Sequence, residues 1–373
     1  MKGKAFVFWV CFMLLGFVVI HRADAVGEHQ GAVKFKTFRY IDQQGIGMEA
    51  FSMLIPADWR FQGGIQWRMD NPAMPAVGAF RVTSPVGTEE LELLPSQMFF
   101  WTNNPMILSN FPIGSRYFGA EVRPPAESLN DLFTGILIPR FRGNEMDLRV
   151  HKVKPLPDLA RQLRAGRQAA PEGTSQSDAG KVRIEYRKNT RRIEEEMFAV
   201  IEANAFSIPS MMGRIINVNW MADYLFSFKA EKGKLDAHAK TFQTMLNSFK
   251  IHPQWFNKYT QLTEYLIRAQ IQQIQNIGQV SRIISQTSNE ISDMIMDSYQ
   301  QRQAVYDRIS TNFSRAIRGV DAYTDPNSGT VELPGGYTHA WTNNLGEYVL
   351  SDDPNFDPNI GSQQNWELMR RNP

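Results

Sequence analysis

Apolar and polar residues alternate between Val33 and about Trp101, which predicts a series of short β-strands. Glycine, proline and asparagine separate the apolar runs and mark turns, as at Gly63-Gly64 and Asn71-Pro72. The strand candidates are 33–37, 51–55, 65–69, 77–83 and 91–94.

Helical patterns interrupt these strands. Ser128 is a good N-cap for a helix that runs to Ile138, because its apolar residues recur on one face. The small, polar residues 165–180 favour a mobile loop. The remaining candidates are helices at 157–167 and 236–249 and strands at 182–186, 195–201 and 214–228. Six to eight strands with three or four helices predict an α+β fold, an antiparallel sheet with packed helices.

The composition and the spacing of apolar residues change after Pro253. Residues 255–318 contain no proline and one glycine, Gly278, and their apolar positions recur three and four apart. This predicts a long amphipathic helix that leaves the sheet domain as an independent rod, of roughly 95 Å if it is continuous. A helical hairpin that turns at Gly278 is the alternative. The apolar stripe can fold back on the β domain, pair in a dimer as an imperfect coiled coil, or bind a partner helix.

The C-terminal residues 319–373 predict a small β-hairpin unit. Tyr337, His339 and Trp341 alternate, a loop with Gly346 follows, and Tyr348 resumes the alternation. The predicted organisation is therefore a segment 1–25, an α+β domain 26–253, a helical segment 254–318 and a tail 319–373. The candidate partner-binding residues lie in this tail: Tyr337, His339, Trp341, Asn343 and Tyr348.

Two segments resemble the elements that open and close a known fold. Residues 48–60 (MEAFSMLIPADWR) and the strand after them resemble an apolar strand, Pro-x-x-Trp and a second strand. Residues 225–250 resemble a strand, a short turn and a helix that ends in Asn-Ser-Phe. Together they resemble the PsbP/Mog1-like α/β fold, in which the closing helix packs across an antiparallel sheet. The resemblance implies binding to proteins or assistance of assemblies, with no shared catalytic residues. The tail, with W-T-N-x-x-G-E-Y, is similar to the ends of exported bacterial proteins.

The first 25 residues predict export. Lys2 and Lys4 precede an apolar run from Ala5 to Ile20, and small residues at Ala23 and Ala25 fit a signal-peptidase site. An uncleaved anchor is the alternative. We expect a bacterial periplasmic or extracellular protein, with no stable membrane span after signal cleavage.

The amino-acid composition limits the kinds of site that the protein can contain. The single cysteine lies within the predicted signal, so the exported chain is expected to have no disulfide, no thiol nucleophile and no thiolate metal site. The net charge of +2 gives no strong pull on nucleic acid. Residues 140–192 are locally basic, with fourteen Lys/Arg against six Asp/Glu, and we interpret them as a solvated, loop-rich face.

No motif indicates catalysis or a cofactor. Glu194, Glu195 and Glu196 are carboxylates, but in a strand the middle one points away from the other two. We expect cross-strand pairing with Arg183, Arg187 or Lys188. The five histidines after the signal have no metal-ligand spacing.

One acidic segment in the tail is similar to a calcium-binding loop. Asp353, Asn355, Asp357 and Asn359 alternate as at the start of an EF-hand, but proline and glutamine occupy its sixth and twelfth positions. Asx-Pro turns explain the same residues. No metal site is predicted.

These observations favour an exported, non-catalytic interaction or scaffold protein, which binds a protein partner or itself through the helix 255–318. The first alternative is an envelope hydrolase acting on a polysaccharide, with Trp59, Trp67 and Trp101 along a sugar-binding cleft; core packing is the favoured role of these tryptophans. The second is a carrier of lipid or another small ligand.

Overall fold

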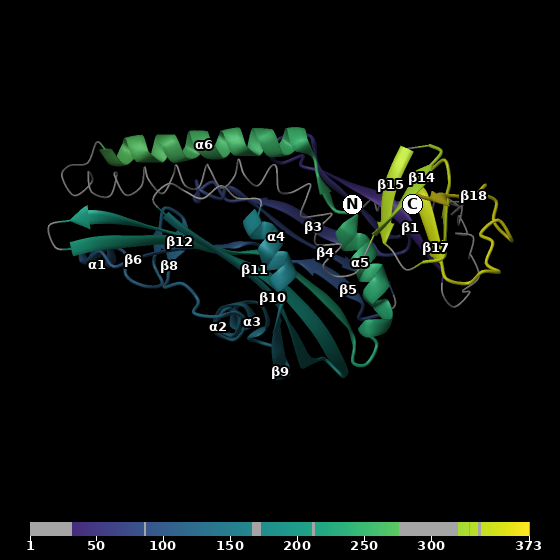
Figure 1. Ribbon diagram of the computed structural model, residues 1–373, viewed down its shortest axis with the longest axis horizontal. Helices are drawn as coiled ribbons and strands as arrows, with labels where there is room; N and C mark the ends of the chain where they lie inside the picture. The colour runs from purple at the N-terminus through teal and green to yellow at the C-terminus, as the bar shows by residue number, and fades with distance from the viewer. Residues whose placement is uncertain are drawn as a thin grey trace, which may run out of the picture.

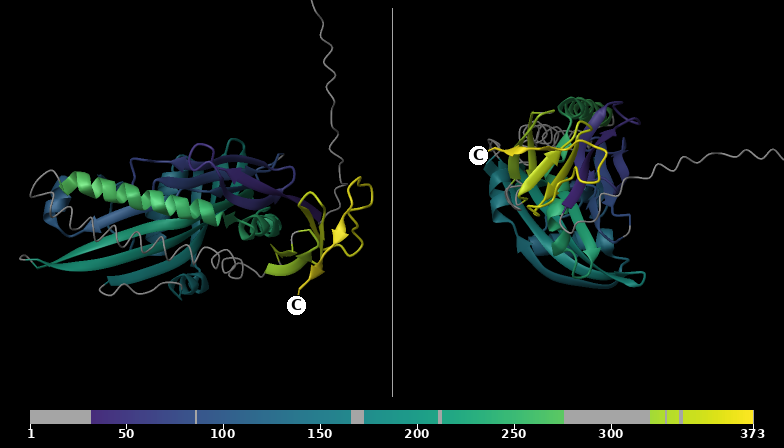
Figure 2. Two further views of the ribbon diagram at one scale, coloured as in Figure 1. Left: turned by 90° about the horizontal axis from the view of Figure 1, so that it is seen from above. Right: turned by 90° about the vertical axis from the view of Figure 1, so that its right-hand side faces the viewer.

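A large, curled antiparallel sheet forms the body of the protein (Figures 1 and 2). The computed structural model describes residues 32–85, 87–165, 173–210, 213–275, 320–327, 329–334 and 337–372. The main path of the sheet is β3-β4-β5-β12-β11-β10-β9, and β6 joins it through β12. Its shorter strands are β3 (Arg60–Trp67), β4 (Ala76–Thr83), β5 (Glu90–Leu93), β6 (Gln97–Thr102), β7 (Arg116–Tyr117), β8 (Ala120–Val122) and β9 (Met146–Pro155).

Three long neighbouring strands dominate this sheet: β10 (Gly173–Lys188), β11 (Arg191–Ser210) and β12 (Gly213–Glu231). The prediction of a loop at 165–180 is therefore wrong for its second half, because residues from Gly173 onward pair with β11. Small polar side chains do not prevent strand formation where a neighbouring strand takes up the backbone hydrogen bonds. The register of β11 against β12 shifts between Phe198 and Val200, next to Tyr224, whose φ is 52°.

A short helical stretch covers one face of the large sheet. It comprises α2 (Leu129–Asp131), the π-helical turns η1 (Leu132–Leu137) and α3 (Ile138–Arg142). Ser128 caps it as predicted, since its hydroxyl accepts a hydrogen bond of 3.1 Å from the Asp131 amide. The predicted apolar face is confirmed as buried: Leu129, Leu132, Phe133, Ile136 and Leu137.

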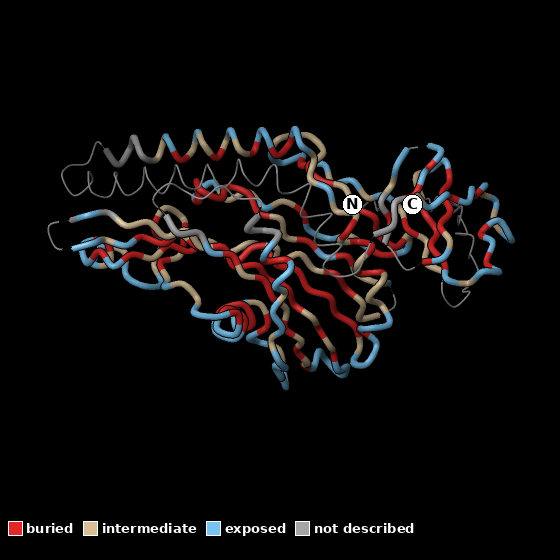
Figure 3. The backbone as a smooth tube through the Cα atoms, viewed as in Figure 1, coloured by how far each residue is buried: buried red, intermediate tan, exposed pale blue. Residues whose placement is uncertain are grey.

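The opposite face of the large sheet carries the main core. Phenylalanines of β11 and β12 pack there against α4 (Pro157–Ala165), α5 (Ala239–Asn247) and the inward residues of β2. A 3₁₀ turn, η2 (Asp236–His238), leads into α5, so the predicted helix from Asp236 is confirmed with an earlier end. Figure 3 shows the buried positions concentrated between these layers.

A second sheet joins the two ends of the chain. Its order is β13-β2-β1-β17-β16-β18, and β1 lies between β2 and the tail strand β17, with Ala32 opposite Ser351. The predicted tail hairpin is confirmed, and it is continuous with the N-terminal strands. The strands are β1 (Ala32–Ile41), β2 (Glu49–Pro56), β13 (Lys250–Ile251), β16 (His339–Thr342), β17 (Glu347–Ser351) and β18 (Glu367–Leu368).

Three further tail strands form a small sheet of their own: β14 (Val320–Asp325), β15 (Gly329–Pro334) and β19 (Arg370–Arg371). Thirteen of the described strands, β1 to β13, lie between Ala32 and Ile251, so the prediction of six to eight strands for the α+β domain was too low. Two-residue strands leave no alternation in a sequence, so a period-two search misses them. The mixed, strand-rich class is as predicted, and the finer resemblance to PsbP/Mog1-like proteins stays a prediction.

The last helix, α6 (Pro253–Gln275), begins where the sequence predicts, and residues 276–318 of the predicted helical segment lie outside the described residues. It runs along the large sheet in Figure 1. Its first turns are not an independent rod, because Trp255, Phe256 and Tyr259 are part of the main core. Of the three ways to cover the apolar stripe, these turns use the contact with the β domain.

A buried carboxylate fixes the start of α6. Asp42, 1% exposed, accepts hydrogen bonds from the indole nitrogens of Trp67 at 3.0 Å and Trp255 at 2.9 Å, and from the Ile46 amide. The turn after β1 thereby holds both β3 and α6. Within the part of the chain that the structure describes, no helix has the length and apolar character to cross a membrane.

Candidate functional site

Two groups of buried polar side chains lie on opposite faces of the large sheet. Successive residues of a strand point to opposite faces. Val200 belongs to the main core, whereas Ala199 and Ile201 pack under the helical stretch 129–142. On each side of the register shift between Phe198 and Val200, the same alternation assigns the polar residues of β10, β11 and β12 to one face or the other.

The first group lies under the helical stretch, and we call it the charge cluster: Glu90, Glu92, Arg142, Glu195 and Lys229. Lys229 of β12 is directly opposite Glu90 on one side and Glu195 on the other. Arg142 comes from α3 and reaches down to the sheet, and its side chain is 7% exposed. Because the sheet supplies four charges and the helix supplies one, the cluster ties the helical cover to the strands.

The members of the charge cluster satisfy one another closely. Arg142 donates to both oxygens of Glu195, at 2.7 and 2.8 Å, and to Glu92 at 2.5 Å. Lys229 Nζ lies 2.6 Å from Glu90 and 2.8 Å from Glu92. The Tyr186 hydroxyl donates to Glu195 Oε2 at 2.8 Å. Such mutual saturation makes a buried ion network tolerable inside a protein.

The pKa values of Glu195 and Lys229 agree with their being ionised. Burial alone would raise the pKa of Glu195, but Arg142, together with Lys229 and Ser227, more than offsets this and holds the pKa below its usual value. Burial likewise opposes ionisation of Lys229, and Glu195 and the neighbouring carboxylates raise the pKa of Lys229 above its ordinary value. A cluster that stays charged on both sides and is closed by its own members is suited to a structural role.

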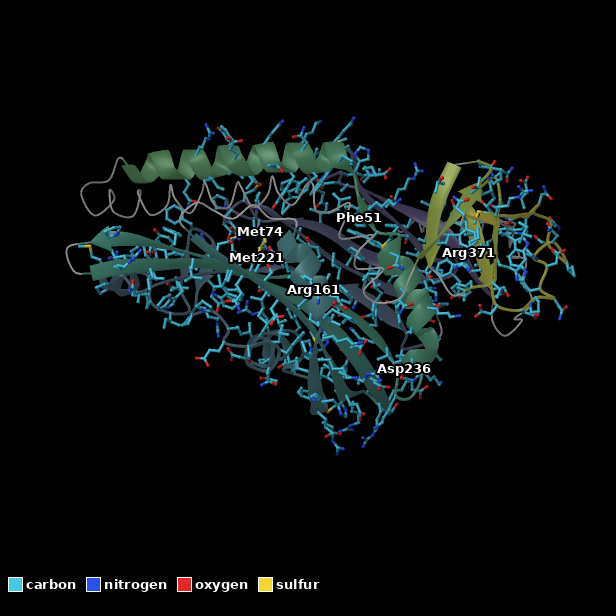
Figure 4. All side chains as sticks on the ribbon, viewed as in Figure 1. Phe51, Met74, Arg161, Met221, Asp236 and Arg371 are labelled. Carbon is cyan, nitrogen blue, oxygen red and sulfur yellow. The ribbon has the colours of Figure 1, made fainter. Side chains whose placement is uncertain are left out.

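The second group lies on the opposite face, and we call it the polar row: Ser177, Glu202, Asn204, Asn217, Asn219 and Asp223. Asn204 is directly opposite Asn219, and Glu202 is opposite Met221, which lies in the middle part of the sheet (Figure 4). Ser177 is opposite Glu202 on the β10 side. These positions continue the face of Val200 and Ala179, so the row extends the main core with polar residues.

Several polar atoms of the row lack hydrogen bonds within the described residues. Asn217 is 0% exposed, and neither its amide nitrogen nor its amide oxygen has a partner there. The Ser177 hydroxyl, in a residue 2% exposed, and the Asn219 amide nitrogen are in the same situation. Each such buried group costs about 1–3 kcal/mol in desolvation. A buried amide with two unused hydrogen-bonding atoms is a feature that a folded protein rarely retains without a use for it.

The two carboxylates of the row are partnered. Asp223 accepts hydrogen bonds from the Ser96 hydroxyl at 2.5 Å and from the Tyr224 amide at 2.8 Å, and Glu202 also has an interaction partner. Their register makes them diagonal neighbours, about 7–8 Å apart in a regular sheet. Because both carboxylates are engaged, the uncharged amides of the row are the better candidates for a binding role.

The glutamate triplet divides between the two faces as expected. Arg183 lies 3.1 Å from Glu194 and 3.6 Å from Glu196, which confirms the predicted cross-strand pairing. It also lies 2.7 Å from Asp236, whose position at the lower right of the molecule is labelled in Figure 4. Arg187 binds Asp147 instead, at 2.9 Å, because its direct neighbour on β11 is Arg192. No local pattern indicated that Glu195 would bind Arg142, which is 53 residues away.

The three tryptophans of the proposed cleft have packing roles. Trp59 is 9% exposed and meets the Phe242 ring edge-on at 6.0 Å. Trp67 packs on the main core and binds Asp42, and Trp101 packs against the residues under the helical stretch.

The candidate partner-binding residues of the tail lie mainly inside it. Tyr337, Trp341, Asn343 and Tyr348 are buried, and His339 is half-buried and stacks on Trp341 at 5.5 Å. Asn343 organises the hairpin loop, since its side-chain oxygen accepts from two backbone amides and its nitrogen donates to Glu347. Their role in binding a partner stays a prediction.

The acidic tail segment forms Asx turns. Asp353 Oδ1 accepts from the Asn355 amide, and Asp357 Oδ1 accepts from the Asn359 amide, both at 2.9 Å. Among the described residues there is no group of three or more His, Cys, Asp or Glu side chains placed to hold a metal ion.

A sequence signal for the polar row exists. Asn217, Asn219 and Asp223 alternate with Val218, Trp220 and Ala222, which is the period of a strand with one polar face. The aromatic content of this stretch suggested an apolar strand and concealed the alternation. The chain matches no protein-family model and no curated protein.

Proposed function

We propose that this chain is an exported, non-catalytic binding protein of the cell envelope, and that the polar row contributes hydrogen bonds to its partner. The observation that carries the proposal is Asn217, a fully buried amide with both polar atoms unpaired within the described residues. A partner that supplies a donor and an acceptor would recover the desolvation free energy of this side chain.

The long strands support this role. Rigid neighbouring strands hold Asn217, Asn219 and Ser177 in a fixed register, so a partner that gains access to these buried polar atoms would bind them without loss of side-chain freedom. The charge cluster on the reverse face stiffens the same strands through Glu195 and Lys229. Export of the protein rests on the signal-like residues 1–25.

The other two functions have less support. A hydrolase would need a carboxylate free to act, whereas Asp223 and Glu202 both have partners. A lipid carrier would need an apolar interior open to its cargo, whereas the apolar half of this face is filled by Phe198, Phe226 and Phe228, which pack on one another.

The proposal is tested by partner capture with residues 26–373. The wild-type protein, Asn217→Leu and Asn355→Leu would be immobilised in parallel and exposed to envelope extract, and the retained proteins and glycans quantified. Asn355 is an exposed asparagine of the tail and provides the matched control. We expect Asn217→Leu to reduce retention of the main partner about tenfold, in line with the loss of one or two buried hydrogen bonds.

Asn355→Leu should retain the partner as the wild type does. Equal retention by Asn217→Leu and the wild type would contradict a binding role for the polar row. Circular dichroism of both variants establishes that each is folded, so that a loss of retention reports on the interface.

A further inference from the structure

The hairpin that joins β10 to β11 ends in a dense group of cations. We call it the basic tip and define it as residues 187–192 (RKNTRR), at the lower end of the large sheet in Figure 1. Lys188 is directly opposite Arg191, and only Asn189 and Thr190 turn the chain between them. Asn189 has a φ of 55°, a left-handed conformation that asparagine tolerates in two-residue hairpin turns.

The register of the hairpin brings its four cations into one compact group. Arg187 is directly opposite Arg192, immediately next to the pair of Lys188 and Arg191. Directly opposite Cα atoms are about 4.5–5.5 Å apart, and consecutive ones are about 3.8 Å apart. The two pairs leave the strands on opposite faces, but Lys and Arg side chains are longer than these separations. All four charges can therefore reach one surface that meets the hairpin end-on.

The basic tip extends beyond the strands on either side of it. The pairing of β10 with β9 reaches as far as Arg187, and the pairing of β11 with β12 begins at Ile193. Residues 188–191 therefore have no described strand beside them, and every residue of the tip is exposed. Figure 3 shows the lower end of these strands as largely exposed. A partner can approach the tip from its end without displacing any other described element.

Three of the four cations are unpaired. Arg187 binds Asp147 at 2.9 Å, whereas Lys188, Arg191 and Arg192 form no ion pair among the described residues. Like charges that lie directly opposite each other destabilise a sheet. Both cross-strand pairs of the tip are of this kind, so the isolated hairpin is destabilised and an anionic partner would relieve the repulsion.

The neighbouring carboxylates do not neutralise the tip. Glu185 is bound by Lys232 at 2.6 Å, and Glu231, which lies within electrostatic reach of Arg191, is bound by Lys234 at 2.6 Å. Glu145, just before β9, has no ion pair within the part of the chain that the structure describes. It offsets at most one of the three unpaired charges, so the tip keeps a net positive charge.

The shape and composition of the tip restrict the kind of anion that fits it. A flat layer of charge that meets the hairpin end-on contacts both cross-strand pairs, whereas a peptide or nucleotide chain along one face contacts only one pair. Residues 187–192 include no aromatic side chain on which a base could stack. Three of the four cations are arginines, whose planar guanidinium groups match the geometry of phosphate oxygens.

From this combination we infer that the basic tip docks on the headgroup phosphates of an anionic lipid bilayer. Clusters of about four or more Lys and Arg residues are typical of surfaces that bind anionic lipid. Along β11, Arg192 is separated from Asn204 of the polar row by twelve residues, or about 40 Å in an extended strand. The bilayer contact therefore leaves the polar row accessible to a different partner, and the inference does not depend on the function proposed for that row.

The inference is tested by co-sedimentation of residues 26–373 with vesicles. One vesicle set is pure phosphatidylcholine, and the other contains phosphatidylglycerol and phosphatidylcholine in equal amounts. We expect binding to the second set at low salt, weaker binding at high salt because the charges are screened, and little binding to the first set. The double substitution Arg191→Gln with Arg192→Gln should reduce the binding at least about tenfold.

The matched control is Arg370→Gln with Arg371→Gln, which removes another adjacent pair of exposed arginines, in the tail strand β19 (Figure 4 labels Arg371). This control should bind the vesicles as the wild type does. Arg191→Lys with Arg192→Lys keeps the charge and should retain most of the binding, and circular dichroism establishes that each variant is folded.

Three outcomes overturn the inference. The first is absence of wild-type binding to the anionic vesicles, including the case in which the protein is retained only by immobilised polyglutamate and the tip therefore binds an acidic protein. The second is an equal loss in the tip variant and the tail control, which would indicate a general effect of net charge. The third is equal binding to both vesicle sets, because binding would then not depend on anionic headgroups.

Discussion

The two faces of the large sheet bury polar residues in opposite ways. Under the helical stretch, Arg142, Glu195 and Lys229 are charged, and every charge meets an opposite charge within 2.9 Å. On the other face, Asn217 and Ser177 are uncharged and equally buried, but their polar atoms have no partner among the described residues. The same strands carry both groups, so differences in backbone rigidity do not explain the contrast.

The comparison distinguishes buried polar side chains that stabilise the fold from buried polar side chains that are available for binding. A closed network stabilises the arrangement that forms it, and its removal damages the fold. An open set of donors and acceptors costs stability in the isolated protein, and its removal should improve the fold and impair binding. Opposite signs of the stability change are therefore the test of the comparison.

The largest expected effect belongs to the charge cluster. Glu195→Ala leaves Arg142 buried without its bidentate partner, and we expect a loss of about 3–5 kcal/mol in the free energy of unfolding. Urea denaturation followed by circular dichroism measures it. The double variant Glu195→Leu with Arg142→Met removes both charges and should recover most of the loss. A loss below about 1 kcal/mol for Glu195→Ala would mean that the cluster does not hold the helical cover, since exposed pairs have that effect.

How much of the structure the sequence predicted depends on how far apart in the sequence the interacting residues lie. Local periodicity predicted the helix capped by Ser128, the strand of Phe51 and the tail hairpin correctly, because neighbouring residues carry that information. It failed at Gly173–Gly180, where the strand depends on a partner strand more than on its own residues. The candidate site depends on contacts between residues that are still farther apart in the sequence. Asn217 and Asn219 alternate visibly with apolar residues, but nothing local indicates that Asn217 is fully buried, or that Arg142 would pair with Glu195.

The dependence of stability on acidic pH provides a second way to distinguish the charge cluster from the polar row. The pKa values of Glu92 and Glu195 are held below their ordinary value of 4.5, against the effect of burial, mainly by Lys229 and Arg142. A depressed folded-state pKa stabilises the protein above the unfolded-state value, and this contribution is lost as the pH falls from about 4.5 through the folded-state values. The uncharged amides of the polar row contribute nothing to this dependence.

We therefore expect the urea midpoint of the wild type to fall steeply below about pH 4.5, and that of Glu92→Gln to fall less steeply. The comparison uses the midpoint of each protein at neutral pH as its own reference. The raised pKa of Lys229 acts at the other extreme, since its contribution is complete at neutral pH and is lost only above about pH 10.5. If the urea midpoints of the two proteins fall equally below about pH 4.5, other carboxylates control acid unfolding.

The smallest effect has the opposite sign and is the sharpest test of the comparison. Asn217→Leu replaces an unpaired, fully buried amide by an apolar side chain of similar size, so we expect a gain of about 1 kcal/mol in the free energy of unfolding. Asn343→Leu is the matched control, because that buried asparagine uses its amide in four hydrogen bonds and should lose about 2 kcal/mol or more on substitution. If Asn217→Leu instead destabilises the protein as Asn343→Leu does, the Asn217 amide is satisfied within the chain, and the polar row is a structural network like the charge cluster on the opposite face.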